Sequence, residues 1–209
     1  MKTIENRGSG ADSRAVAEAA EVLRRGGIVI YPTDTLYALG CDALNSRAVE
    51  RLCRIKGINP ERNYLSIVCH DISQAADYAR IDNRAFAILR RSLPGPFTFV
   101  LPSATALPKV FRGRRSVGVR IPDCDFARAL AEELGHPVMT SSAVPADADD
   151  DYDASEADGA SVALDFDGFS EIELAVDAGC CAGIPSTIVD LTDSTEPEII
   201  RQGAGELSL

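Results

Sequence analysis

Tryptophan is absent from this chain, and histidine, methionine and lysine are scarce. The 209 residues hold two histidines, two methionines and three lysines, against 18 arginines. The histidines, His70 and His136, have no metal-ligand spacing to each other or to a cysteine, and the six cysteines include no CxxC pair. We therefore expect no protein-bound metal, and we interpret the cysteines as thiols in a reducing compartment.

Long apolar runs are also missing. No stretch approaches the roughly 20 apolar residues that a membrane-spanning helix needs, and residues 1–10 are too polar for a secretory signal. The mean hydropathy of -0.02 and a hydrophobic content of 45% suit a globular protein. We expect a cytoplasmic protein without a membrane partner, and one domain over residues 1–209 with its core at about 15–205.

Basic charge is in deficit, because the net charge is -11. This balance argues against a dedicated nucleic-acid binder, which needs a basic surface. Seven carboxylates lie between residues 147 and 158, and the rest of the chain carries only -4. We expect an acidic surface loop over 146–159, which leaves room for a basic concavity elsewhere. The preference for arginine over lysine is better explained by codon usage than by function.

Familiar nucleotide and hydrolase motifs are lacking too. The chain has neither a GxxxxGK[ST] loop nor a GxGxxG fingerprint, so ATP would have to bind without a P-loop or a Rossmann turn. It also has no nucleophile-elbow motif and no clear Ser/His/Asp or Cys/His arrangement. The sequence therefore excludes the commonest nucleotide-binding loops, but not nucleotide binding itself.

Hydrophobic periodicity and breaker residues predict an α/β protein. Strands that alternate with helices, followed by a strand-rich last third, indicate a single-domain, twisted mixed sheet with helix cover. Either Asp123 or Asp125 should cap the fourth helix. We expect helices over 12–25, 46–55, 84–91 and 125–134, and strands over 28–31, 64–69, 97–101, 117–121, 138–140, 161–164, 173–176, 187–191 and 198–201.

Two segments place polar groups where a buried strand or a helix ends. After the apolar run 28–31, the sequence PTDT releases hydroxyls and a carboxylate, which suit a ligand site at a sheet edge or an ordinary Asx/Thr turn. Arg54, Lys56 and Arg62 follow a predicted helix, where they could bind phosphates or only complement the helix dipole.

Two further segments carry a buried cation and several hydroxyls. Arg120 lies among apolar residues of a predicted strand, so it needs an anionic partner, either a substrate carboxylate or a structural acid. The hydroxyls of 140–142 and 186–187 lie at strand ends, where they could bind phosphate oxygens or act as ordinary turn hydroxyls.

Taken together, these segments resemble the YrdC/YciO family of threonylcarbamoyl-AMP synthases. Residues 26–40, GGIVIYPTDTLYALG, resemble its GG-x-V-x-x-PT-D-T-x-Y-G-L-G opening. Motifs similar to the family's follow in the same order: PGPFT at 94–98, VGVRIP at 117–122, PSTIVD at 185–190 and IRQGAG at 200–205. The match extends over nearly the whole chain.

The resemblance implies a YrdC/RibB-like fold with a large, concave, positive cavity. It implies an enzyme, a nucleotidyltransferase that joins L-threonine, bicarbonate and ATP into threonylcarbamoyl-AMP and pyrophosphate for tRNA modification, helped by Mg²⁺. The resemblance leaves open a homodimer, and tRNA or double-stranded RNA as further ligands.

Residue by residue, the resemblance implies two groups of contacts in one cavity. Arg54, Lys56 and Ser141 would be catalytic. The ATP phosphates would meet Arg54, Lys56, Arg62, Ser141, Ser186, Thr187 and Arg201, and threonine would meet Thr33, Thr35, Tyr37 and Arg120.

Two departures from the family pattern bring the chain closest to the YciO branch. The asparagine of the family's S-x-N motif is Ala143 here, and the lysine and arginine of its K-x-R pair are exchanged at Arg54 and Lys56. If the missing amide held phosphate, Ala143→Asn should raise activity. The alternative function is a YciO-type protein that binds nucleotide or double-stranded RNA with little or no synthesis, aided by the arginine cluster at 112–115.

Overall fold

The computed structural model describes residues 1–209 except 7–9, 60–65, 105–114, 147, 149–153 and 208–209. Its helices are α1 (Ser13–Arg24), α2 (Ser46–Ile55), α3 (Ile72–Tyr78), α4 (Asn83–Ser92), α5 (Asp125–Leu134) and α6 (Gly159–Asp165). Its strands are β1 (Lys2–Glu5), β2 (Ile28–Tyr31), β3 (Ala38–Asp42), β4 (Ser66–Val68), β5 (Phe97–Pro102), β6 (Ser116–Arg120), β7 (Val138–Ser142), β8 (Ile172–Asp177), β9 (Thr187–Asp190) and β10 (Glu198–Arg201).

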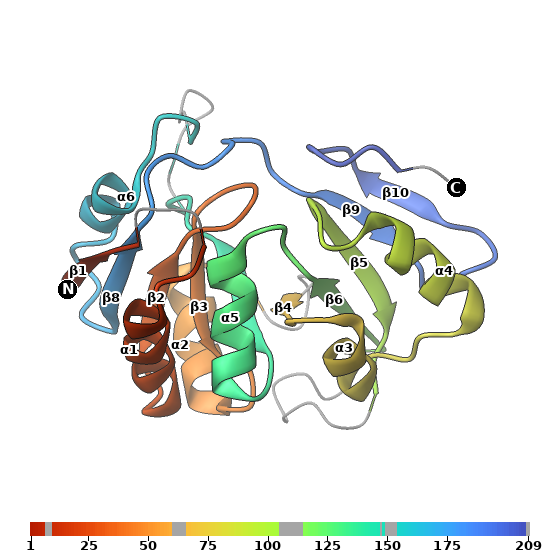
Figure 1. Ribbon diagram of the computed structural model, residues 1–209, viewed down its shortest axis with the longest axis horizontal. Helices are drawn as coiled ribbons and strands as arrows, with labels where there is room; N and C mark the ends of the chain where they lie inside the picture. The colour runs from red at the N-terminus through yellow and green to blue at the C-terminus, as the bar shows by residue number, and fades with distance from the viewer. Residues whose placement is uncertain (7–9, 60–65, 105–114, 147, 149–153, 208–209) are drawn as a thin grey trace.

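One ten-stranded sheet joins these strands in the order β1-β8-β2-β3-β7-β4-β6-β5-β9-β10. The pairs β1–β8, β2–β8, β4–β6 and β5–β9 are parallel, and the remaining pairs are antiparallel. Figure 1 shows β8, β2 and β3 in one half of the molecule, β5, β9 and β10 in the other, and the short β4 and β6 between them. The predicted mixed sheet with helix cover is confirmed.

Helices bury both faces of the first half of the sheet. Along β2, Ile28 and Ile30 join a core that includes side chains of α2, α4 and α6, whereas Val29 and Tyr31 join a core shared with α1 and α5. Successive strand residues point to opposite faces, so an unbroken apolar run belongs to a strand covered on both sides. Figure 1 shows α1 and α5 in front of these strands and α2 behind them.

Polar caps and glycines set several helix ends where the sequence predicts them. The carboxylate of Asp12 accepts a hydrogen bond from the Arg14 N–H at 2.8 Å, and the Asn45 side chain accepts one from Ala48 at 3.2 Å. Gly135 ends α5 with φ of 80°, a left-handed conformation that a side chain would strain.

The predicted cap of α5 is wrong. Cys124 occupies its N-cap position, and Asp125 is already the first helical residue, with its carboxylate 2.5 Å from the Arg128 guanidinium. The backbone N–H of Asp123 donates to the Asp34 carboxylate at 3.0 Å. Two aspartates separated by one residue do not determine at which residue the helix begins.

The predicted strand at 161–164 is also wrong, because these residues belong to α6. Asp158 accepts a hydrogen bond from the Ser161 N–H at 2.9 Å, while the Ser161 hydroxyl accepts one from the Asp158 N–H at 3.0 Å. This reciprocal capping box starts a helix within the stretch predicted as an acidic loop. Of that stretch, residues 147 and 149–153 lie outside the described part of the chain.

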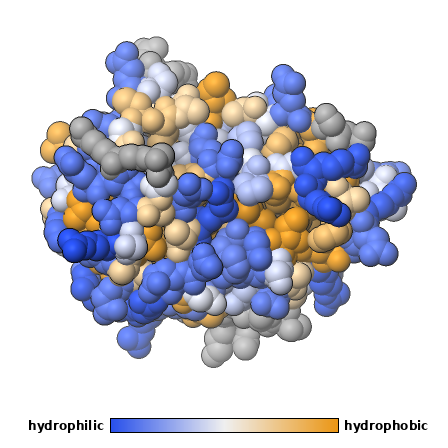
Figure 2. Space-filling model, in the orientation of Figure 1, coloured by the Kyte–Doolittle hydropathy of each residue, from blue (hydrophilic) through white to orange (hydrophobic). Residues whose placement is uncertain are grey.

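Figure 2 shows the distribution of hydrophilic and hydrophobic residues on the face of the molecule seen in Figure 1. Hydrophilic residues cover most of it, and hydrophobic ones gather over α3 and α4. An apolar groove there is lined by Ile72, Phe86, Leu93 and Ile121, and Phe86 is exposed. Among the described helices, none has the length and apolar character to cross a membrane.

Tyr31 gives the fold a testable dependence on alkaline pH. Its buried hydroxyl donates to Thr140 Oγ1 at 2.8 Å, and burial raises its pKa to about 12. Above pH 10 the unfolded chain releases this proton while the folded chain keeps it, so the free energy of unfolding falls as pH rises from 10 to 12. The free energy of unfolding can be measured in urea at pH 9 and at pH 11. We expect its decrease between these two pH values to be about 1 kcal/mol smaller for Tyr31→Phe than for the native chain. Parallel losses in the two proteins would contradict this assignment.

Candidate functional site

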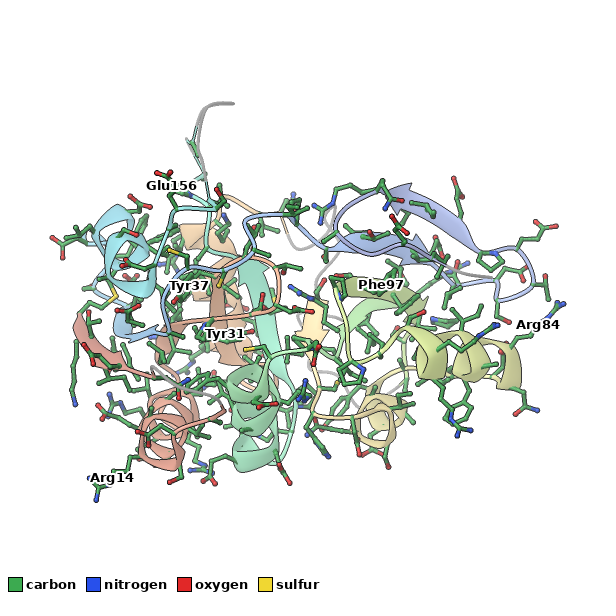
Figure 3. The ribbon with its side chains drawn as sticks, turned by 45° about the horizontal axis from the view of Figure 1, so that its top comes forward. Arg14, Tyr31, Tyr37, Arg84, Phe97 and Glu156 are labelled. Carbon is green, nitrogen blue, oxygen red and sulfur yellow. The ribbon has the colours of Figure 1, made fainter. Side chains whose placement is uncertain are left out.

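A hollow of about 160 Å³ opens between the two halves of the sheet. Its apolar part comes from Leu36, Ile58, Met139 and Ile188. Hydroxyl and guanidinium groups supply the polar part, from Thr35, Tyr37, Ser66, Thr98, Arg120, Thr140, Ser141, Ser142, Ser186 and Arg201. Figure 3 shows the molecule with its top turned forward, with Tyr31 and Tyr37 in one half and Phe97 in the other.

Curling of the sheet brings these residues together. Ala38 of β3 and Arg201 of β10 line the same hollow, although the sheet order places five strands between β3 and β10. At about 4.8 Å per strand, a flat sheet would separate these two strands by roughly 29 Å. The sheet therefore folds round the cavity.

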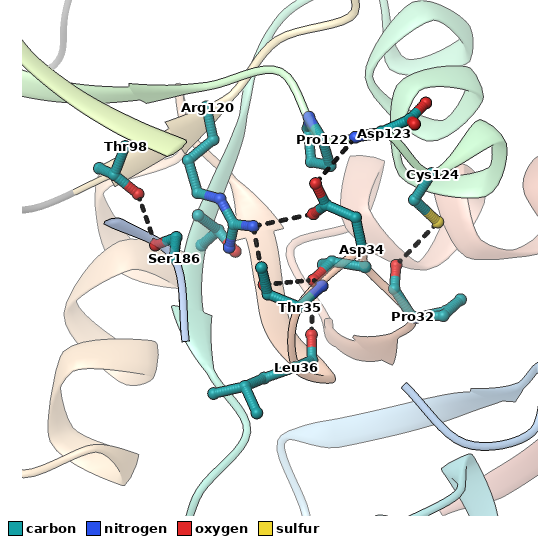
Figure 4. Close-up of polar contacts among 12 residues, drawn as sticks. Pro32, Asp34, Thr35, Leu36, Thr98, Arg120, Pro122, Asp123, Cys124 and Ser186 are labelled. Atoms are coloured by element: carbon teal, nitrogen blue, oxygen red, sulfur yellow. Dashed lines mark hydrogen bonds and ion pairs between the residues drawn. The ribbon is translucent and has the colours of Figure 1, made fainter. Parts of the chain in front are cut away.

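Arg120 lies at the end of β6 with a buried guanidinium. Its Nη2 donates to Asp34 Oδ1 at 3.1 Å and to Thr35 Oγ1 at 2.9 Å, as Figure 4 shows. The side chains of Arg120 and Asp34 are only 11% and 9% exposed. Of the two partners that the sequence left open, the structure supplies the structural acid. The Nε of Arg120 is buried without a hydrogen-bond partner among the described residues.

The hydroxyls of Thr33 and Thr35 continue this network in a fixed direction. Thr33 donates to the Leu36 carbonyl at 2.6 Å, so the 3.0 Å contact between the two threonine hydroxyls must have Thr35 as its donor. Thr35 then accepts from Arg120. The proton of each hydroxyl is committed within the protein, and neither is left to donate to a ligand.

Arg201, at the end of β10, is the second cation of the cavity. Its Nη2 donates to the Ser186 carbonyl at 2.7 Å and lies 3.5 Å from the Ser186 hydroxyl. Burial and the nearby Arg120 guanidinium lower the pKa of Arg201. Within the described residues Arg201 forms no ion pair, and the lining residues include no carboxylate. The arrangement favours an anionic ligand.

Close strand packing places further hydroxyls beside the arginines. A Cβ on Gly118 of β6 would lie 2.5 Å from Ser66 Oγ and 3.2 Å from Thr98 Cγ2, so only glycine permits this approach without a shift. Thr98 and Ser186 are hydrogen-bonded through their hydroxyls at 3.0 Å. Hydroxyls from β4, β5 and the start of β9 thus converge on one wall.

Tyr37 ties the cavity to the connection between β8 and β9. Its hydroxyl donates to the Gly179 carbonyl at 2.7 Å and accepts from the Ala178 N–H at 2.9 Å. Burial raises the pKa of this hydroxyl above its ordinary value. The Gly183 N–H also donates to the Thr35 carbonyl at 2.9 Å. Tyr37 therefore holds the chain segment that leads to Ser186.

Comparison with known families shows to which family the chain belongs. The model of the Sua5/yciO/yrdC family, described as telomere recombination, matches residues 21–203. The chain belongs to this family. The matched span contains every residue of the cavity described above.

Relatives of two kinds within the family resemble the chain. The YciO protein of Escherichia coli is 32% identical over 196 residues, which are 93% of this chain and 91% of that protein. Its crystal structure superposes with a TM-score of 0.85 over 98% of this chain and 97% of the other. The nearly full mutual coverage confirms the resemblance to the YciO branch.

Synthases of the family are similar over a shorter part of their own length. A threonylcarbamoyl-AMP synthase of Bacillus subtilis is 35% identical over 192 residues, which are 90% of this chain but 53% of that protein. The Sua5 protein of Pyrococcus abyssi, solved in complex with L-threonine, gives a TM-score of 0.82 at 32% identity, over 97% of this chain and 58% of that one. A synthase-like family is therefore established for this chain.

The family's basic pair does not line the cavity. Arg54 is exposed in the last turn of α2, and Lys56 follows directly as its C-cap. The Lys56 ammonium donates to the Val144 carbonyl, two residues after β7, and burial lowers its pKa. Arg62 lies outside the described residues. Of the four described cations among the five expected at the site, Arg120 and Arg201 line the cavity and Arg54 and Lys56 do not.

Thr33 and Thr187 also lie away from this cavity. Thr33 borders a neighbouring hollow of about 230 Å³ together with Asp34, Cys124 and Cys181. Thr187 is fully buried, and its hydroxyl donates to the Gly205 carbonyl at 2.7 Å. The same hydroxyl accepts from the N–H groups of Gly203 and Gly205 at 2.9 and 3.0 Å. Its bonds hold the segment after β10 in place.

Ala143, at the position of the family's asparagine, is buried in the apolar core and not in the cavity wall. Its N–H donates to the Tyr37 carbonyl at 2.7 Å, and the residue is 3% exposed. An asparagine here would first have to leave the core before its amide could reach a ligand. The geometry therefore does not directly support the expected increase in activity of Ala143→Asn.

Asp34, Ser66 and Thr98 were not predicted as site residues. Thr98 belongs to the PGPFT motif, and Ser66 lies within the strand predicted at 64–69, so strand alternation could have marked both. Asp34 was visible as part of PTDT, but nothing local in the sequence indicates its partner, 86 positions away. Across the described residues, no cluster of three or more His, Cys, Asp or Glu side chains could hold a metal.

Proposed function

We propose that this protein forms threonylcarbamoyl-AMP and pyrophosphate from L-threonine, bicarbonate and ATP, for modification of tRNA. The observation that carries the proposal is that Arg120 and Arg201 share a hydroxyl-rich cavity whose described lining residues include no carboxylate. Membership of a family that includes threonylcarbamoyl-AMP synthases supports the choice of reaction.

The chemistry needs a site that neutralises negative charge. The threonine amine attacks the bicarbonate carbon, water leaves, and the resulting carbamate oxygen attacks the α-phosphorus of ATP while pyrophosphate departs. An anion must therefore approach a highly charged triphosphate, and catalysis depends on positioning and on fixed positive groups. Arg201 supplies charge to the triphosphate, and Ser141 and Ser186 donate hydrogen bonds to its oxygens.

Arg120 binds the threonine carboxylate in this proposal, within the wall formed by Thr35 and Tyr37. Lys56 and Arg54 act from the rim, toward the outer phosphates, since Lys56 already contacts the segment that follows β7. Lys56 forms no ion pair with any described residue, so an incoming phosphate would compensate its partial burial.

Mg²⁺ would find no carboxylate among the described residues that line this cavity. Carboxylates are its usual protein ligands. The residues therefore do not fit a protein-bound magnesium ion, and an ion that enters with ATP would be held by phosphate oxygens and water.

The proposed reaction is tested by incubating the purified protein with ATP, radiolabelled bicarbonate and L-threonine. We expect labelled threonylcarbamoyl-AMP and an equal amount of pyrophosphate, formed only when all three substrates are present. Omission of threonine is the matched control. Absence of product with a protein that binds ATP would contradict the synthase proposal.

The second candidate is a YciO-type protein that binds a nucleotide or double-stranded RNA with little or no synthesis. It is favoured by Ala143 in the core and by the positions of Arg54 and Lys56 outside the cavity lining. ATP binding without product would support it. Affinity for double-stranded RNA that falls steeply with salt would identify RNA as the ligand. Of the arginine cluster at 112–115, only Arg115 lies within the described residues, where it is exposed.

A further inference from the structure

Asp34 connects three parts of the chain beside the cavity. It follows β2, its Oδ1 accepts from Arg120 at the end of β6, and its Oδ2 accepts from the Asp123 N–H at 3.0 Å, just before α5. Both carboxylate oxygens are therefore engaged, and the side chain is 9% exposed. Figure 4 shows the carboxylate between the Arg120 guanidinium and the Asp123 backbone.

The contacts of Asp34 fix one end of the Arg120 guanidinium. Nη2 donates to both Asp34 and Thr35, so two acceptors from adjacent residues hold the same nitrogen. The Thr35 acceptor is itself oriented, because its own proton points to Thr33. A planar guanidinium held in this way has one orientation, and its remaining donors face in set directions.

Asp34 also makes the net charges at the two arginines unequal. Its negative charge lies 3.1 Å from Arg120, whereas Arg201 forms no ion pair with a described residue. Arg120 is thus a largely compensated donor, and Arg201 carries the uncompensated charge of the cavity. From the described lining residues, an entering anion meets about one net positive charge instead of two.

We propose that Asp34 is a positioning residue: it orients Arg120 for the carboxylate of the amino-acid substrate and limits the net charge that the triphosphate encounters. The part that concerns the amino acid rests on the proposed function. The part that concerns charge requires only that a nucleotide binds in this cavity.

The test compares three variants by titration calorimetry with ATP and with L-threonine. Asp34→Asn removes the charge, Thr35→Val removes the neutral acceptor, and Asp123→Asn is the matched control, since its side chain is 73% exposed. For Asp34→Asn we expect ATP to bind about 3- to 10-fold more tightly and L-threonine to bind about 10-fold more weakly. For Thr35→Val we expect weaker threonine binding at unchanged ATP affinity, and for Asp123→Asn less than a twofold change in either.

Tighter ATP binding in Asp34→Asn is an outcome that simple loss of structure would not produce. Unchanged affinities, or an equal loss for both ligands, would overturn the proposal. If circular dichroism shows that Asp34→Asn does not fold, Asp34→Glu decides: it keeps the charge but moves the carboxylate, so we expect weaker threonine binding at unchanged ATP affinity, and unchanged threonine affinity there overturns the proposal. If the native protein binds no threonine and forms no product, the proposed function fails, and the ATP measurement still tests the role of Asp34 in setting the charge.

Discussion

Replacement of Arg201 by glutamine is expected to weaken ATP binding about 10- to 100-fold. Arg201 is the cavity cation without an ion pair among the described residues, and it lies beside the partly compensated Arg120. A charged hydrogen bond to a phosphate contributes about 1.5–3 kcal/mol, which corresponds to this range. Glutamine keeps a donor near Ser186 but removes the charge. Titration calorimetry at about 0.15 M salt measures the ATP affinity of both proteins while long-range attraction between exposed charges is screened.

Arg84→Gln provides the control for the change in overall charge. Arg84 is an exposed arginine of α4, and Figure 3 shows it at the far end of the second half, away from Tyr37. We expect its ATP affinity to remain within twofold of the native value. Equal losses in the two variants would mean that ATP responds to total charge and not to this cavity.

Thr187→Val should lower the free energy of unfolding by about 2–4 kcal/mol. Valine has nearly the same shape, but it leaves the buried N–H of Gly205 and the half-buried N–H of Gly203 without the Thr187 hydroxyl, while the Gly205 carbonyl keeps its 2.8 Å hydrogen bond from Gln202. Each unsatisfied buried group costs about 1–3 kcal/mol, partly relieved by local adjustment. Urea denaturation should show a lower midpoint at an unchanged slope.

Thr192→Val is the matched control for this substitution. Thr192 is exposed, and its hydroxyl donates only to Asp190, so we expect a loss below about 1 kcal/mol. The same pair of variants separates the two roles considered for Thr187. Reduced ATP affinity at native stability would favour the phosphate contact that the family resemblance implies, and would contradict the structural role.

Much of the fold follows from local features of the sequence. Capping residues such as Asp12 and Asn45 mark helix starts, and the apolar run 28–31 marks a strand buried on both faces. β1, β3 and α3 were not predicted. The run 161–164 alternates over too few residues to separate a strand from a helix, and the capping box at Asp158 and Ser161 decides the outcome.

The candidate site was predictable as a set of motifs but not as a geometry. Thr35, Tyr37, Arg120, Ser141, Ser186 and Arg201 all line the cavity. Ser186 and Thr187 are neighbours at the start of a strand, however, and neighbouring strand residues point to opposite faces. A motif names both hydroxyls without telling which one faces the ligand. The pairing of Arg120 with Asp34 depends on tertiary contacts between β6 and the segment after β2, which no local pattern encodes.

The most direct test of the account is a crystal structure of the protein with a non-hydrolysable ATP analogue and L-threonine. We expect the triphosphate within hydrogen-bond distance of Arg201 and Ser186, and the threonine carboxylate on Arg120, with Asp34 still paired to that guanidinium. A nucleotide bound elsewhere, for example in the apolar groove between α3 and α4, with the cavity empty, would contradict the central claim.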